Sequence, residues 1–80
     1  MDIKKSDAVA TLLEVRNIRD KELIEVIQHA EDTDQKFHHP ETGRFLAGKR
    51  LGKATYYVLY SVNESRYTVH TAYWCKSELS

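Results

Sequence analysis

The sequence holds four histidines and one cysteine, the side chains that most often bind transition metals or act as base and nucleophile at neutral pH. His38 and His39 are adjacent, so in an extended segment they point to opposite sides and do not share an ion. His29 falls near the end of a predicted helix, and His70 and Cys75 fall on the last predicted strand. No C-x-x-C or H-x-x-x-H spacing is present, so the sequence predicts no metal site and no cofactor.

A second set of side chains has the types used by small ribonucleases, in which basic residues hold the RNA while a histidine and a tyrosine exchange protons. This set consists of Arg44, Lys49, Arg50 and Lys53, with His70 and Tyr73. The alternative is a solvated edge strand, where lysines discourage unwanted strand pairing. Twelve basic and twelve acidic residues give zero formal net charge, which argues against a nucleic-acid partner but leaves a local basic patch open. A compact basic patch beside His70 would favour the ribonuclease hypothesis, and dispersed positions would argue against it.

Aromatic side chains are concentrated in the C-terminal third of the chain. They predict either core packing or a recognition surface, and packing is favoured because a short chain must bury most of its large side chains. If the sheet has a ligand-binding surface, we expect it to contain Tyr57, His70 and Trp74, with Arg44 and Lys49 nearby. No catalytic residue is predicted.

Length and composition predict a single domain over residues 1–80, with residues 1–5 disordered. One cysteine excludes an intrachain disulfide. No apolar run reaches membrane-spanning length, and the N-terminus is too polar for a signal peptide. A cytoplasmic protein without membrane association is therefore expected.

The clearest structural signal is a β-hairpin formed by residues 55–62 and 67–74, which are β-branched or aromatic at most positions. Residues 63–66 are polar and have the length of a hairpin connection. Strict alternation divides the second strand into two faces, with Tyr67, Val69, Thr71 and Tyr73 on one and Thr68, His70, Ala72 and Trp74 on the other. Neither face is wholly polar, so we expect helices on one face and tyrosine rings partly covering the other.

Two helices are predicted before the sheet. The first begins at a cap formed by Ser6 or Asp7, with a strand over residues 12–15 as the alternative. The second covers residues 21–32 with Asp20 as its N-cap. It ends in an acidic run, which is unfavourable at a helix C-terminus.

The middle of the chain predicts a strand over residues 44–50 that leads into the hairpin through a turn at Gly52. A short additional strand is expected over residues 36–38, ended by Pro40. The predicted fold is α+β, with two N-terminal helices on one face of a three- to four-stranded antiparallel sheet, in the order α-α-β-β-β.

From Asp20 onward the chain resembles a small uncharacterised bacterial and archaeal domain that occurs alone or beside FAD-dependent, glutamate-synthase-type oxidoreductases. The matching runs are EVIQHAE at residues 25–31, TGRFLA at 42–47, TYYVLY at 55–60 and YTVHTAY at 67–73. The family commonly continues with a Ser-His-Arg-Met-like run, whereas this chain has Trp74, Cys75, Lys76 and Ser77, so no catalytic role is carried over. The resemblance implies an accessory or interaction module near a redox enzyme.

Three functional hypotheses follow. The leading one is a non-enzymatic module that binds a protein partner, or a second copy of itself, through its sheet. The alternative is a toxin similar to the RelE/BrnT type, which also pairs helices with an antiparallel sheet and cleaves RNA, or an inactive relative of such a toxin. The third is a small redox- or metal-responsive domain that uses His70 and Cys75.

Overall fold

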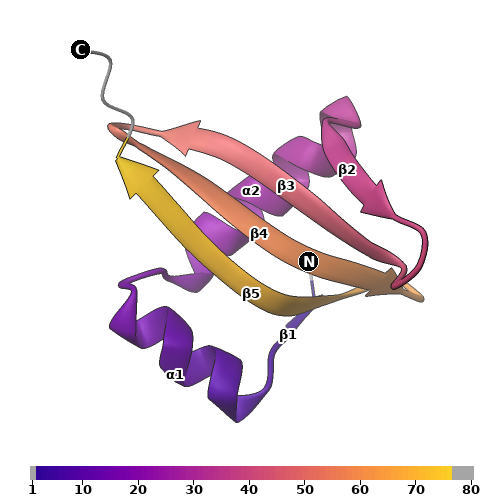
Figure 1. Cartoon of the computed structure of the whole chain (residues 1–80), viewed down its shortest axis with the longest axis horizontal. Helices are drawn as coiled ribbons and strands as arrows, with labels where there is room; N and C mark the ends of the chain where they lie inside the picture. Colours follow the sequence, from indigo (N-terminus) through magenta and orange to yellow (C-terminus); the bar gives the residue numbers. More distant parts are fainter. Residues whose placement is uncertain (1, 77–80) are drawn as a thin grey trace.

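The computed structural model describes residues 2–76, which form an α+β fold of two helices and one five-stranded sheet (Figure 1). The elements in chain order are β1 (Asp2–Lys4), α1 (Asp7–Val15), α2 (Asp20–Thr33), β2 (Lys36–His39), β3 (Arg44–Leu51), β4 (Ala54–Asn63) and β5 (Arg66–Lys76). The α+β class and the order of helices before the main strands are therefore confirmed.

The sheet is larger than expected and is not purely antiparallel. Its strand order is β1-β5-β4-β3-β2, and β1 runs parallel to β5 while the other neighbours are antiparallel. Three residues of β1 pair with Arg66, Tyr67 and Thr68. The expectation of disorder over residues 1–5 is thus wrong for residues 2–4, because a partner more than sixty residues away orders them. Met1 and Ser77 lie outside the described residues.

Local sequence explains where both helices begin and end. The Ser6 side chain accepts a hydrogen bond from the backbone N–H of Val9 at 3.2 Å, so α1 has the expected cap and residues 12–15 are helical. At α2 the N-cap is Arg19 and not Asp20, because the Glu22 carboxylate accepts from the Arg19 backbone N–H at 2.7 Å.

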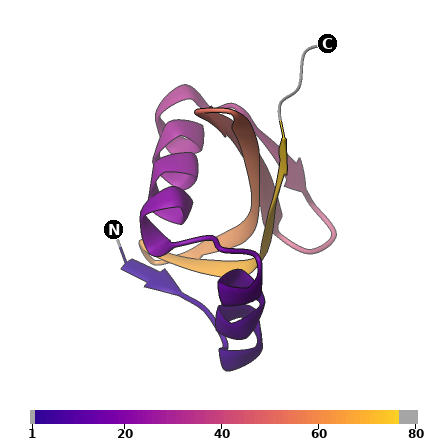
Figure 2. The ribbon, with the colours of Figure 1, turned by 90° about the vertical axis from the view of Figure 1, so that its left-hand side faces the viewer.

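The core lies between α2 and one face of the sheet, and Figure 2 shows α2 on one side of the curved strands. Its buried members are apolar side chains of α1, α2 and the central strands, plus one tyrosine. They are Leu13, Ile18, Leu23, Val26, Ile27, Ala30, Ala47, Val58, Tyr60, Val69 and Ala72. Within this layer α2 packs against β3 and β4, and α1 contacts β5.

A β-bulge changes which residues of β5 face the helices. Val58 pairs with Ala72, but Tyr60 pairs with Val69, so the register shifts between Leu59 and Tyr60. The predicted strict alternation is therefore wrong beyond Val69. Val69 and Ala72 both face the core, and the residues between them take up the extra length.

The two edges of the sheet differ. Along β5, the edge is covered first by β1 and then by the end of α1, where the Arg16 guanidinium donates to the Ala72 carbonyl at 2.7 Å. The Trp74 indole N–H in turn donates to the Arg16 carbonyl at 2.8 Å. At the opposite edge lies β2, whose Phe37 side chain is 75% exposed.

No helix in residues 2–76 is long and apolar enough to cross a membrane.

Candidate binding surface

One face of the sheet carries no helix within residues 2–76, and we call it the uncovered face (Figure 2). Strand register places on it alternate residues of β2 to β5, opposite in phase to the core residues. They include Phe37, Arg44, Leu46, Gly48, Arg50, Tyr57, Leu59, Ser61, His70, Thr71 and Tyr73. Tyrosine rings lie on both faces of the sheet, as expected from the sequence.

An aromatic row crosses the middle of the uncovered face. Gly48 pairs with Tyr57 and Tyr57 pairs with Tyr73, and the two tyrosine rings stack with centroids 5.1 Å apart at 24°. A Cβ atom at Gly48 would come within 2.9 Å of the Tyr57 ring. Glycine at position 48 therefore lets the ring lie against the strand, and Tyr73 beside it keeps 39% of its surface exposed.

A polar group lies further along the same face. The Ser61 hydroxyl and the His70 Nε2 atom are 2.9 Å apart and share a hydrogen bond. Partial burial and then the nearby Arg44 charge lower the pKa of His70, so its imidazole is neutral at neutral pH. The Arg44 guanidinium can bind an anionic group by charge-assisted hydrogen bonds. The neutral imidazole beside it adds no negative charge that would oppose this binding.

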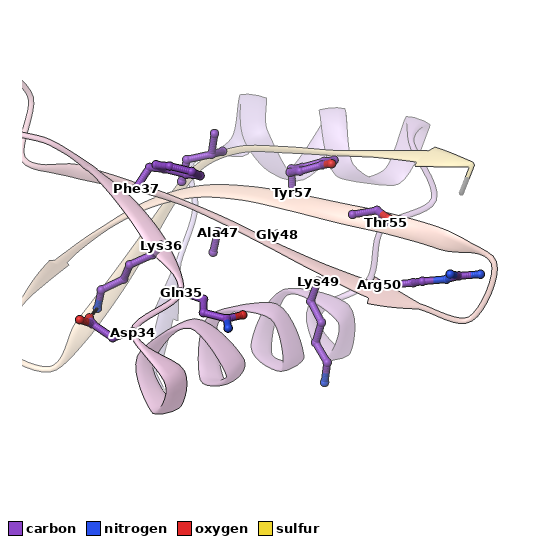
Figure 3. A pocket seen from close by; sticks show the side chains of 11 residues that line it. Asp34, Gln35, Lys36, Phe37, Ala47, Gly48, Lys49, Arg50, Thr55 and Tyr57 are labelled. Carbon is purple, nitrogen blue, oxygen red and sulfur yellow. Dashed lines mark ion pairs between the residues drawn. The ribbon is translucent and has the colours of Figure 1, made fainter. Parts of the chain in front are cut away.

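The sheet edge beside this face has a hollow of about 560 Å³, which we call the edge notch (Figure 3). It exists because β2 is shorter than β3. The first residue of β2, Lys36, pairs with Ala47, whereas β3 continues beyond Ala47 to Leu51. Its lining residues are Asp34, Gln35, Lys36, Phe37, Leu46, Ala47, Gly48, Lys49, Arg50, Thr55 and Tyr57.

Backbone geometry makes Arg50 the part of β3 that faces the notch. Leu51 and Ala54 close a hairpin with a two-residue loop, so they form its hydrogen-bonded pair. Alternate residues then direct their N–H and C=O groups away from β4, and Arg50 is one of them. The backbone N–H and C=O groups of Arg50 thus point to the side of β3 that the pairs with β2 do not reach.

An ion-pair network holds β2 in place next to the notch. Lys36 Nζ pairs with the Glu31 carboxylate and lies 4.7 Å from the centre of the Phe45 ring. The Tyr60 hydroxyl donates to the same carboxylate at 2.8 Å. Burial alone would raise the pKa of Glu31, but the bonds from Lys36 and Tyr60 outweigh burial and lower it. The network links the end of α2 to three strands.

The structure brings together only some of the predicted surface residues. Arg44, Tyr57 and His70 share the uncovered face. Lys49 and Trp74 instead flank Tyr56 on the helix side, and Figure 3 shows Lys49 pointing toward α2. The bulge explains Trp74, because it moves Trp74 to the face opposite His70.

The residues of the ribonuclease hypothesis do not form one compact patch. The uncovered face carries Arg44, Arg50, His70 and Tyr73, whereas Lys49 is on the opposite face and Lys53 is in the turn after β3. Tyr73 pairs with Tyr57, which is four residues from Ser61, the partner of His70, or about 13 Å along the strand. The proposed acid and base do not meet.

Sequence reasoning missed Phe37, Gly48 and Ser61. Phe37 is exposed although its type suggests burial, because it lies on the edge strand and on the uncovered face. Gly48 pairs regularly with Tyr57, although a glycine within a strand is typical of a bulge. In residues 2–76, no group of three histidine, cysteine or acidic side chains is placed to hold a metal ion.

Comparison of the chain with protein-family models, with curated proteins and with solved structures finds no match.

Proposed function

We propose that this chain is a non-enzymatic interaction module that receives an extended segment of a partner protein in the edge notch. The observation that carries the proposal is the length mismatch between β2 and β3, which leaves the Arg50 backbone facing a hollow in line with β2. A segment placed there would continue the line of β2 and pair with β3.

The side chains around the notch suit such a segment. Phe37 and Tyr57 give an apolar contact on the uncovered face, while Lys49 and Arg50 give positive charge (Figure 3). Alternate side chains of an added strand point to opposite sides, so one set would meet the aromatic rings. The sheet's other edge offers less, since β1 and Arg16 already occupy it.

The resemblance to domains found beside FAD-dependent oxidoreductases makes such an enzyme the first protein partner to test. A second copy of the chain is the next. Size-exclusion chromatography with light scattering, repeated over a range of concentrations, separates self-association from binding to another protein.

A proline at position 50 should strongly weaken binding of the partner segment. Binders would first be selected from a displayed library of random peptides, and their affinities measured by anisotropy. Arg50→Pro removes the N–H that faces the notch but none of the hydrogen bonds to β4, so the hairpin should survive. We expect at least tenfold weaker binding.

Arg50→Gln is the matched control, because it removes the guanidinium and keeps the N–H. Peptides should bind this variant within about threefold of the original affinity. The remaining loss comes from the missing guanidinium charge at the border of the notch. Equal binding by the proline variant, or failure to select any peptide, would contradict strand addition at the notch.

We also expect no RNA cleavage by the chain. His70 is bonded to Ser61 and lies far from Tyr73, so the two do not form an acid–base pair around one phosphate. Incubation with single-stranded RNA should give the same product pattern for the unmodified chain and for His70→Ala. Cleavage that disappears in His70→Ala would replace the binding proposal with the ribonuclease alternative.

A further inference from the structure

The zero net charge conceals a separation of charge between the two layers. The helices are acidic, with Asp7 and Glu14 in α1 and Asp20, Glu22, Glu25, Glu31 and Asp32 in α2, against one lysine, Lys21. The strands from β2 to β5 contain no acidic residue. Their basic residues are Lys36, Arg44, Lys49, Arg50, Arg66 and Lys76. An argument from net charge therefore does not apply to the sheet.

On the uncovered face the positive charge borders exposed aromatic rings. Arg44 and Arg50 lie on β3 on either side of the row formed by Gly48, Tyr57 and Tyr73. Arg66 is also at this face, but Asp2 accompanies it at 3.7 Å. Two arginines thus remain on β3 to attract an anion that also has planar groups.

We propose that the uncovered face binds single-stranded nucleic acid, without cutting it, by stacking a base on Tyr73 and by holding phosphate with Arg44. The Tyr57–Tyr73 stack already spans two strands, and a base placed on Tyr73 extends it by one ring. Base stacking on aromatic side chains over a positive groove is how sequence-tolerant single-strand binders work.

The geometry favours nucleic acid over an acidic protein segment on this face. A protein segment gains most of its specificity by pairing its backbone with a strand edge, and the edge notch provides that beside the face and not on it. Planar bases need a flat ring at the surface, together with hydrogen-bond donors. Tyr73 supplies the ring, and Arg44, Ser61 and His70 supply the donors.

The test is anisotropy of a fluorescent oligouridylate of about twelve nucleotides, titrated with the full chain at low salt. Tyr73→Leu should weaken binding about tenfold, because leucine keeps the apolar bulk and loses the ring. Tyr73→Phe should bind like the unmodified chain. Two phosphate contacts predict a slope of log affinity against log salt near −1.4, and Arg44→Gln should reduce its magnitude by about 0.7.

Lys21→Gln, on the acidic helix layer, is the charge-matched control and should change nothing. A duplex of the same length should bind more weakly, since its bases are already stacked. Absence of oligouridylate binding, or equal binding by Tyr73→Leu and Tyr73→Phe, would overturn the proposal. Displacement of the oligouridylate by polyglutamate at equal charge would assign the face to an acidic protein instead. Arg50→Pro removes one of the two phosphate contacts and no ring, so it should reduce the magnitude of the salt slope by about 0.7 and keep the loss on Tyr73→Leu. A variant that loses peptide binding but keeps ring-dependent oligouridylate binding distinguishes failure at the notch from failure here.

Discussion

Replacing Tyr60 with alanine is expected to lower the free energy of unfolding by about 4 kcal/mol. Tyr60 has no exposed surface, and its ring centroid lies 5.7 Å from that of Phe45 and 6.1 Å from that of Tyr67. Removal of the ring leaves a cavity between the sheet and α2 and deletes the hydroxyl that donates to Glu31. A chain of this size has roughly 4–12 kcal/mol of stability, so the substitution should remove at least about a third of it.

Tyr60→Phe separates the hydroxyl from the ring. It keeps the packing and removes only the bond to Glu31, so we expect a loss of about 1.5 kcal/mol. Urea denaturation followed by circular dichroism measures both variants. A loss below about 1 kcal/mol for Tyr60→Ala would mean that the ring is not packed as described, and the position of β2 would then need another explanation.

The same network predicts how stability depends on pH. Because the folded-state pKa of Glu31 is below the ordinary value of 4.5, its contribution is present above that pH and is lost as pH falls below it. Burial and then the Glu31 carboxylate raise the pKa of Tyr60, so its contribution is present below about pH 10 and is lost above it. In Glu31→Gln the decline below pH 4.5 should be smaller.

Local patterns predicted the parts of the fold that local forces decide. Alternation in residues 55–62 identified β4, and the Ser6 cap fixed the start of α1. The turn before β5 was also placed, although Glu64 and Ser65 adopt left-handed φ values of 50° and 68° without a glycine. These features depend on residues close together in the chain.

Features that depend on distant residues could not be read in this way. Residues 2–4 form a strand only because β5 offers them a parallel partner. The bulge in β5 has no glycine or proline to mark it, yet it decides that Trp74 faces the helices and His70 does not. Two of the five expected surface residues, Lys49 and Trp74, lie on the helix side, and the bulge accounts for Trp74.

The distribution of charge also could not be predicted from the sequence. Zero net charge argued against a nucleic-acid partner and left a local patch open, since composition cannot tell which face carries which sign. Acidic residues on α2 and arginines such as Arg44 and Arg50 on β3 cancel in the sum. They are separated by the thickness of the sheet, so a ligand on the uncovered face meets mainly the arginines.

Arg16→Met is expected to destabilise the fold by about 2 kcal/mol and to loosen the end of α1. The guanidinium donates at 2.7 Å to the carbonyl of Ala72, a residue with 1% of its surface exposed. Methionine keeps much of the aliphatic stem but leaves that carbonyl without its charged donor. Urea denaturation gives the free energy, and hydrogen exchange should show faster exchange of α1 amides than of α2 amides.

Arg19→Met is the matched control, because Arg19 is exposed and makes its described helix contact through the backbone. A change in the free energy of unfolding within about 0.5 kcal/mol is expected.

The Arg16 variant should also associate with itself more strongly, since the uncapped part of β5 becomes a second strand edge able to pair with another chain. If Arg16→Met stays monomeric at high concentration, packing of α1 and not the guanidinium protects that edge. In that case Trp74→Phe, which removes the bond to the Arg16 carbonyl and keeps a ring, should also leave the oligomeric state unchanged.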